Sequence, residues 1–201
     1  MASRRQFIQS GLVLSVGSLT WIPDFALPTG ELPAPSLRIE RFVFDGRFVA
    51  AVELARHAAR HGMPLAETSG DLTDLWYNDF DLRWKQAPMA LAGMTTRGGL
   101  FVLETLAADH HMRVVYRGTH HASRDGRVRH VLSGPARLIA RATAHSTVPF
   151  WERLGRAMHE CPPDGRRMTE RTLTTSAEGM AGGEPLFSWL IAPRSPQTAT
   201  I

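Results

Sequence analysis

The sequence predicts an α/β protein with a mostly parallel sheet flanked by helices and a C-terminal antiparallel extension. Between residues 37 and 121, short runs rich in β-branched and aromatic residues alternate with longer segments of helical periodicity, giving three to four β-α repeats. Strands that alternate with helices in this way are typical of a parallel sheet covered by helices. After residue 121 the runs are separated by an Asp-Gly turn and a Gly-rich turn, a pattern that favours antiparallel pairing.

The first half of this region supplies the predicted parallel strands. The expected strands cover residues 37–45, 63–71, 88–94 and 113–121. The expected helices between them cover residues 46–62, 73–86 and 95–112. In the first helix Phe48, Val52, Ala55 and Ala59 recur at helical spacing, and Gly62 suits its end. Either Thr73 or Asp74 could cap the second helix, and either Thr95 or Thr96 the third.

The second half predicts two further helices and the antiparallel strands. A hairpin turns at Asp125-Gly126, so that His130 could face the histidines of the preceding strand. The remaining expected elements are helices at 134–144 and 148–160 and strands at 166–176 and 184–194. Ser133 would cap the first of these helices, with Pro135 in its first turn. We expect the last two strands to extend the edge of the sheet.

Composition excludes several classes of protein. The chain carries a formal net charge of +4 and its sequence pI is about 10.2. Lys85 is the only lysine, and the arginines are spread among acidic residues rather than gathered in one block. Arginines spread in this way do not form the basic block that runs along a phosphate backbone, so we expect no nucleic-acid partner. The single Cys161 excludes an intrachain disulfide.

The N-terminus carries the most specific motif of the chain. Residues 3–9 read SRRQFIQ, and the matching positions are Ser3, Arg4, Arg5 and Phe7. This stretch resembles the twin-arginine (Tat) export signal, whose pattern is roughly S-R-R-x-F-L-K. The apolar run that follows, to Ile22, is interrupted by polar residues and is shorter than the roughly 20 residues needed to span a bilayer.

The resemblance implies export of a folded protein by the Tat translocase, with a periplasmic or extracellular destination. Tat substrates often carry a cofactor or travel with a signal-less partner. We expect a signal peptide at 1–27, a Pro-rich linker at 28–36, a single α/β domain at 37–194 and a flexible tail at 195–201. The linker holds no A-x-A cleavage signal, so cleavage after Ala26 and retention as a membrane tether both stay open.

Candidate ligand-binding residues follow the predicted strands, because ligands of open α/β sheets collect beyond the carboxyl ends of the strands. The candidates are Asp45, Ser69, Asp71, Asp74, Thr95, Thr96, Arg97, Gly98, Arg117, His120 and His121. Residues 95–99 are the most suggestive: small hydroxyl and glycine residues open a helix there, and Arg97 adds a positive charge. An ordinary helix cap with closely packed glycines explains the same residues. The segment matches neither a P-loop nor a dinucleotide-binding fingerprint.

The histidines and aspartates are candidates for a metal site or a catalytic site. Glu53, His57 and His61 share one helical face, where neighbouring arginines favour a solvated surface over a cation site. His120 and His121 at the end of the fourth strand are the histidines that we would test first. Ser69 with Asp71 and either of these histidines is a conceivable catalytic set, although no G-x-S-x-G motif is present. No partner for a nucleophilic Cys161 is visible.

The segment 71–84 permits two interpretations. It places Asp71, Asp74, Asp79 and Asp81 among the aromatic residues Trp76, Tyr77 and Trp84. These side chains could form a ligand-binding wall in which a carboxylate acts as a base or cation ligand. A plain amphipathic helix with its aromatic side chains inward accounts for the pattern as well.

Two functions are compatible with these observations. The first is an exported binding or accessory protein for a small anionic ligand or a partner enzyme. The alternative is a periplasmic hydrolytic or metal-assisted enzyme that uses histidines and aspartates at the strand ends. An exposed apolar patch near Trp151 or Trp189 would favour a partner protein. The sequence identifies no cofactor.

Overall fold

A seven-stranded mixed sheet organises the computed structural model, which describes residues 36–163, 167–176, 179–180 and 183–194. The strands are β1 (Ile39–Asp45), β2 (Leu65–Thr68), β3 (Ala90–Thr96), β4 (Met112–Ala122), β5 (Arg127–Pro135), β6 (Met168–Ser176) and β7 (Leu186–Pro193). The helices are α1 (Val49–Arg60), α2 (Thr73–Leu75), the π-helical turn η1 (Trp76–Phe80), α3 (Asp81–Gln86), α4 (Arg97–Asp109), α5 (Ala136–Ala142) and α6 (Phe150–His159). The Tat-like motif, residues 28–35 of the linker and the tail 195–201 lie outside the described residues.

The order of the strands corrects the prediction of a mostly parallel sheet. The order is β2-β1-β3-β7-β4-β5-β6, and only the pairs β1–β2 and β1–β3 are parallel. The other four pairings are antiparallel. Two of them, β3–β7 and β4–β7, arise because β7 inserts between β3 and β4. β4 therefore runs in the same direction as β3 without touching it. β6 forms the edge as expected, whereas β7, expected at the edge, lies inside the sheet.

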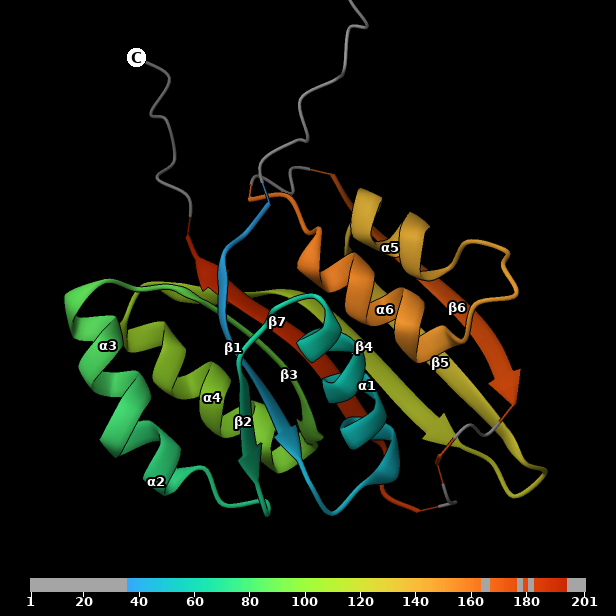
Figure 1. The fold of residues 1–201 in the computed structure, drawn as a ribbon, viewed down its shortest axis with the longest axis horizontal. Helices are drawn as coiled ribbons and strands as arrows, with labels where there is room; N and C mark the ends of the chain where they lie inside the picture. Colours follow the sequence, from blue (N-terminus) through green and yellow to red (C-terminus); the bar gives the residue numbers. More distant parts are fainter. Residues whose placement is uncertain (1–35, 164–166, 177–178, 181–182, 195–201) are drawn as a thin grey trace, which may run out of the picture. The chain divides into compact units, whose positions relative to one another are not determined.

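Helices cover both faces of the sheet (Figure 1). Helices α1, α5 and α6 lie on one face, where they bury Leu54, Leu138 and Leu154 against the sheet. Helix α4 and the α2–η1–α3 segment lie on the other face, where Leu103 and Trp84 join a second apolar cluster. The α/β class with helices on both faces is thus confirmed. Among the described residues, no helix has the length and hydropathy needed to cross a bilayer.

The sequence pattern explains the end of α1 and the start of α4, but not the start of α2, where Leu72 rather than Thr73 or Asp74 stands at the cap position. Gly62 adopts a φ of 78° just beyond α1, as a helix-ending glycine does. Of the expected apolar face of α1, Ala55 is buried and Phe48 and Val52 pack against the core, but Ala59 is exposed, because the buried face is centred on Leu54 and Ala58. Thr96 rather than Thr95 caps α4. Pro135, not Ser133, directly precedes α5, because Ser133 is still paired within β5.

The hairpin between β4 and β5 is confirmed. Gly126 adopts a φ of 75°, which suits the predicted turn at Asp125-Gly126. The register pairs His120 with His130, as the expected turn required. Period-two alternation then places the side chains of His120 and His121 on opposite faces of the sheet.

The segment 73–86 behaves largely as an amphipathic helix with one irregular turn. Trp76, Phe80 and Trp84 are buried, and they pack against α4 and the sheet. Tyr77 points outward and is 66% exposed, because the π-helical turn adds a residue to the helical repeat. Trp151 and Trp189 are both buried, so the expected apolar patch is not found at either residue.

Candidate functional site

The candidate site lies where the chain leaves β1 and β3 in opposite directions. These strands are neighbours, and each ends at the same edge of the sheet. After β1 the chain enters α1 on one face, and after β3 it enters α4 on the other face. Such a topological switch point leaves a crevice between the two connections, and ligands of open α/β sheets bind there. We call this edge the switch-point edge.

Asp45 ends β1 and holds Arg47 in place. The Asp45 side chain is 1% exposed and the Arg47 side chain is 53% exposed. Arg47 Nε donates to Asp45 Oδ1 at 2.9 Å, and Arg47 Nη2 donates to Oδ2 at 2.6 Å. This bidentate pair raises the pKa of Arg47 through its hydrogen bonds to Asp45. Asp45 is therefore occupied as a positioning group, and it is not a free base.

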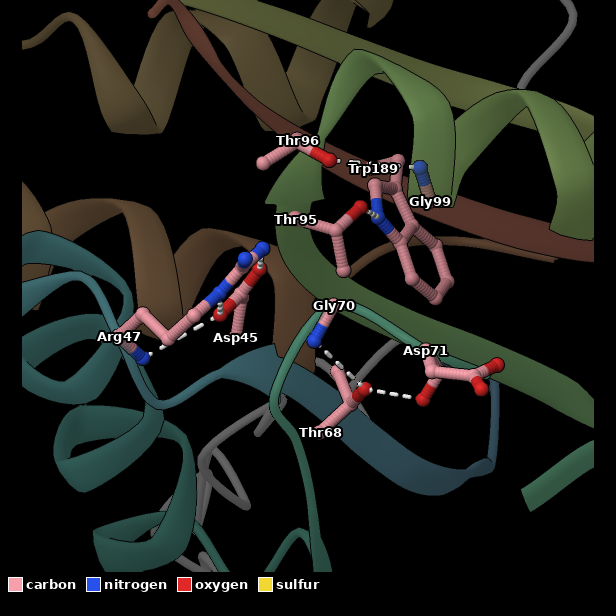
Figure 2. A network of polar contacts seen from close by, with 9 residues as sticks. All are labelled: Asp45, Arg47, Thr68, Gly70, Asp71, Thr95, Thr96, Gly99 and Trp189. Carbon is pink, nitrogen blue, oxygen red and sulfur yellow. Dashed lines mark hydrogen bonds and ion pairs between the residues drawn. The ribbon is translucent and has the colours of Figure 1, made fainter. Parts of the chain in front are cut away.

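The loop after β2 borders Arg47. Thr68 Oγ1 donates to the carbonyl of Asp71 at 2.5 Å and accepts from the amide of Gly70 at 3.1 Å (Figure 2). Gly70 has a φ of 103°, and a β-carbon there would collide with the Arg47 guanidinium, so both the conformation and the space require glycine. Asp71 Oδ1 accepts from the amide of Thr73 at 2.8 Å. Hydrogen bonds from Thr73, first from its side chain and then from its amide, lower the pKa of Asp71.

The connection after β3 supplies the start of a helix. Thr95 is buried, and its Oγ1 accepts a hydrogen bond from Trp189 Nε1 at 3.1 Å (Figure 2). Thr96 Oγ1 accepts from the amide of Gly99 at 3.4 Å. No acceptor within the described ranges satisfies the amides of Arg97 and Gly98, and both residues are exposed. The Arg97 guanidinium likewise has no ion-pair partner in the part of the chain that the structure describes.

A hollow of about 310 Å³ opens beside these groups. It lies between the loop after β2 and the first turns of α4. Its lining residues are Gly70, Asp71, Leu72, Thr73, Trp76, Tyr77, Gly98, Gly99, Val102 and Leu106. One end is thus formed by polar backbone and the start of a helix, and the wall is formed by aromatic and aliphatic side chains. Residues 71–84 therefore combine the two interpretations. Tyr77 lines the hollow, as a ligand-binding wall would, while Trp84 is buried, as in an amphipathic helix.

Not every predicted residue reaches this hollow. Ser69 and Asp74 are exposed near its loop, yet neither lines it. Arg117 lies further along the sheet, where Nη2 forms an ion pair with Glu104 Oε2 of α4 at 2.6 Å. His121 is exposed, whereas His120 is fully buried beneath α6. The four chain segments therefore end at one edge, but β7 keeps the end of β4 apart from the hollow.

His120 belongs instead to a chain of buried polar side chains. The chain crosses four strands of the sheet on the α6 face, and it runs through Tyr116, Ser188, His120, His130 and Thr175. Its successive distances are 2.9 Å, 2.7 Å, 2.7 Å and 2.9 Å. Phe150 and Trp151 of α6 pack against both imidazole rings.

The two ends of this chain fix the direction of every hydrogen bond. The Thr175 hydroxyl donates to the carbonyl of the next residue at 2.9 Å, so it must accept from His130 Nε2. A neutral His130 then accepts at Nδ1, which makes His120 Nδ1 the donor at 2.7 Å. His120 Nε2 accepts from the Ser188 hydroxyl, and Ser188 in turn accepts from the Tyr116 hydroxyl. Each imidazole therefore has one defined tautomer.

Burial keeps both imidazoles neutral. Desolvation lowers the pKa of His120 well below its ordinary value, and the neighbouring His130 adds to the effect. Desolvation, followed by the charge of Arg153, lowers the pKa of His130 to about 4. Desolvation also raises the pKa of Tyr116. A proton added to either ring would place two donors face to face, so this chain is built for neutral groups.

The other predicted chemistry finds no support in the described residues. No group of three or more His, Cys, Asp or Glu side chains is arranged to hold a metal ion there. His57 is buried against α6 rather than solvated, with Nδ1 3.9 Å from Glu152 Oε2. Cys161 is buried, which raises the pKa of its thiol to about 12. It is not an activated nucleophile.

Sequence reasoning missed several residues at these sites. Arg47 follows Asp45 by two positions at the end of a strand, and this spacing could have suggested the bidentate pair. Val102 and Leu106 recur on one face of α4, which helical periodicity alone could have indicated. Ser188 gave no signal, because its role depends on the insertion of β7 next to β4. Comparison with known proteins finds no matching family model, curated protein or solved structure.

Proposed function

We propose that this protein binds a small anionic ligand that carries an apolar group, in the hollow at the switch-point edge. The observation that carries this proposal is that the hollow reaches the start of α4, where Gly98 lines it and the Gly98 amide has no acceptor among the described residues. Arg97 precedes Gly98 in the chain, and its amide and its charge likewise have no partner in the described ranges. A carboxylate or phosphate oxygen suits the amides of Arg97 and Gly98, because α4 has 13 residues and its dipole favours negative charge there.

The apolar part of the ligand is inferred from the wall. Val102 is 42% exposed and Tyr77 is 66% exposed, although both side chains are large and apolar or aromatic. Covering them with a ligand removes apolar surface from water, which stabilises the complex by roughly 25 cal/mol for each Å² covered. A hollow of about 310 Å³ limits the ligand to a small molecule.

The test is a thermal-shift screen of the full-length chain with a panel of small aryl and alkyl carboxylates and phosphates. A ligand found in this way should bind Arg97→Gln about fivefold more weakly, since an exposed charged contact contributes on the order of 1 kcal/mol. Arg124→Gln is the matched control, because Arg124 is an exposed arginine on the β4–β5 turn that lines no part of the hollow. Equal affinities of the two variants would refute the assignment.

A second variant tests the place of binding without removing a charge. A β-carbon added at Gly98 meets only Thr96 Oγ1, at 3.9 Å, which is an ordinary van der Waals contact, and Gly98 lines the hollow. Gly98→Leu should therefore fold normally and should block binding by filling the hollow. Binding that survives Gly98→Leu unchanged would move the ligand to another part of the protein.

The proposed function includes export through the Tat translocase. This proposal is supported by the motif at Ser3, Arg4, Arg5 and Phe7, which matches the Tat pattern in sequence. Residues 1–36 fused to a reporter that matures only in the cytoplasm and functions after export should deliver it to the periplasm. Replacement of Arg4 and Arg5 by lysine should stop delivery. Continued export of the double-lysine fusion would contradict the proposal.

Binding is favoured over hydrolytic or metal-assisted catalysis by the environment of the candidate groups. His120 and His130 are neutral and closed to solvent, while Ser69 is exposed and has no hydrogen-bonded base among the described residues. A partner enzyme remains compatible with the proposal. Phe101 is 67% exposed on α4 next to Val102, so the rim of the hollow offers apolar surface to a protein as well.

A further inference from the structure

A β-bulge at the start of β1 directs Glu40 away from the regular sheet. Ile39 pairs with Ala90 and Arg41 pairs with Leu91, so one extra residue stands between them on β1. A bulge of this kind changes the direction of a side chain and occurs frequently beside binding sites. The affected edge holds the amino ends of the parallel strands, opposite to the switch-point edge.

The Glu40 carboxylate is only half satisfied. Its side chain is 7% exposed, and Oε1 accepts a hydrogen bond from Arg83 Nη1 at 2.8 Å. Oε2 is buried and has no hydrogen-bond partner among the described residues. A buried carboxylate oxygen without a donor is costly, so this atom calls for a donor that the described residues do not supply.

Glu40 lines a hollow of about 530 Å³, which is distinct from the one at the switch-point edge. Its other lining residues are Ser36, Leu37, Arg38, Ile39, Arg41, Gly62, Met63, Pro64, Arg83, Met89 and His159. Oε2 is closed to water in the unliganded arrangement. The last torsion of a glutamate side chain is soft, so rotation of the carboxylate turns this oxygen toward the hollow. The same rotation moves Oε1 relative to Arg83 Nη1, so a ligand has to offset a weaker bond to Arg83.

The hollow has a negative and a positive pole. Its negative pole combines Glu40 with the C-terminal ends of two helices, because Gly62 follows α1 and His159 ends α6. Helix C-termini favour a cation. Its positive pole is formed by Arg38, which is exposed and has no ion-pair partner in the described part of the chain, and by Arg41. Arg41 Nη1 donates to the Glu40 carbonyl at 3.1 Å, and Arg41 Nε lies 3.7 Å from Asp79 Oδ2 in a long, partly exposed ion pair, so a ligand carboxylate shares this guanidinium with Asp79.

We propose that this second hollow binds a free α-amino acid. The ammonium group donates to Glu40 Oε2 and faces the two helix C-termini, and the carboxylate pairs with Arg38 and Arg41. A purely anionic ligand leaves Glu40 unsatisfied, and a purely cationic ligand faces the arginines without compensation. The site is independent of the proposed anion site, since no residue lines both hollows.

The experiment is a thermal-shift measurement on the full-length chain with each of the 20 common L-amino acids. At least one of them should raise the melting temperature, and isothermal titration calorimetry then gives its dissociation constant. Its N-acetyl derivative, which lacks the ammonium group, and its methyl ester, which lacks the carboxylate, should each bind at least about tenfold more weakly. No shift with any amino acid at 10 mM (roughly the weakest affinity worth measuring) would overturn the proposal.

Matched variants assign the binding to this hollow. Glu40→Gln should weaken binding of the amino acid at least about tenfold, while Glu53→Gln on the exposed face of α1 should leave it unchanged. Arg38→Gln should weaken binding roughly fivefold, and because Arg38 is exposed and unpaired in the described structure, this variant should fold even if Glu40→Gln does not. Equal binding of the N-acetyl derivative, or full affinity in Arg38→Gln, would refute the proposal.

Discussion

The buried histidine pair makes a quantitative prediction about stability in acid. The unfolded chain protonates His130 near its ordinary pKa of 6.5, whereas the folded protein protonates it only near 4. Between these two pH values the unfolded state binds the additional proton, so stability falls as the pH falls from about 6.5 to about 4. A difference of this size corresponds to roughly 3 kcal/mol at about 1.4 kcal/mol per pH unit. The lowered pKa of His120 acts in the same direction.

Urea denaturation followed by tryptophan fluorescence at pH 7.5, 6.5, 5.5 and 4.5 measures this effect, over a range that starts about one pH unit above the ordinary pKa and ends just above the folded pKa of about 4. His130→Asn removes the titrating ring and keeps an acceptor for His120 Nδ1, but it loses the bond to Thr175. This variant should start from a lower stability at pH 7.5 and then lose less on acidification. His121→Asn is the control, since His121 is exposed on the opposite face and should follow the wild type. Parallel pH profiles for the wild type and His130→Asn would refute the reasoning.

Three further predictions concern packing, the switch-point edge and the cysteine. Gly93→Ala should destabilise the fold by about 1–3 kcal/mol in urea denaturation, because the added β-carbon collides with the Val43 carbonyl oxygen and the Trp189 ring. Gly98→Ala makes only an ordinary contact with Thr96 and should change stability by less than about 1 kcal/mol, so equal effects would contradict the packing. Asp45→Asn should lower the free energy of unfolding by about 1–3 kcal/mol, because the wholly buried side chain can no longer accept both hydrogen bonds from Arg47. A smaller loss in urea denaturation would show that the fold does not depend on this pair. Cys161 should resist iodoacetamide at pH 8 in the folded protein and react in urea, since burial raises its pKa to about 12; rapid labelling without urea would contradict its burial.

The sequence predicted the β-α repeats because their two periodicities are local properties of the chain. The position of β7 was missed, although its composition carried a signal. From Leu186 to Ala192 the strand is nearly all apolar, a pattern typical of a strand that is covered on both faces. By contrast, β6 is mostly polar, and its residues are exposed or half-buried, which is typical of a strand at the edge of a sheet. A comparison of the two strands would have placed β7 inside the sheet and reduced the expected share of parallel pairs.

The sequence could predict only those residues of the candidate site that are brought together by the direction of parallel strands. Asp45, Asp71 and Thr96 meet at one edge because β1, β2 and β3 are parallel. His120 does not join them, because alternation along β4 turns its ring to the α6 face while β7 separates the two strand ends. The outward turn of Tyr77 depends on a π-helical turn for which the sequence gives no local signal.

The most direct test of the proposed function is a ¹H–¹⁵N NMR titration of the full-length chain with phenylacetate, a small carboxylate with an apolar ring. The account predicts that the amide signals of Gly98, Tyr77 and Val102 shift together, because these residues line one hollow, and that the signal of Arg97, which precedes Gly98 at the start of α4, shifts with them. The same titration of Gly98→Leu should leave them unmoved. Shifts confined to other parts of the chain, or equal shifts in the variant, would contradict ligand binding at the switch-point edge.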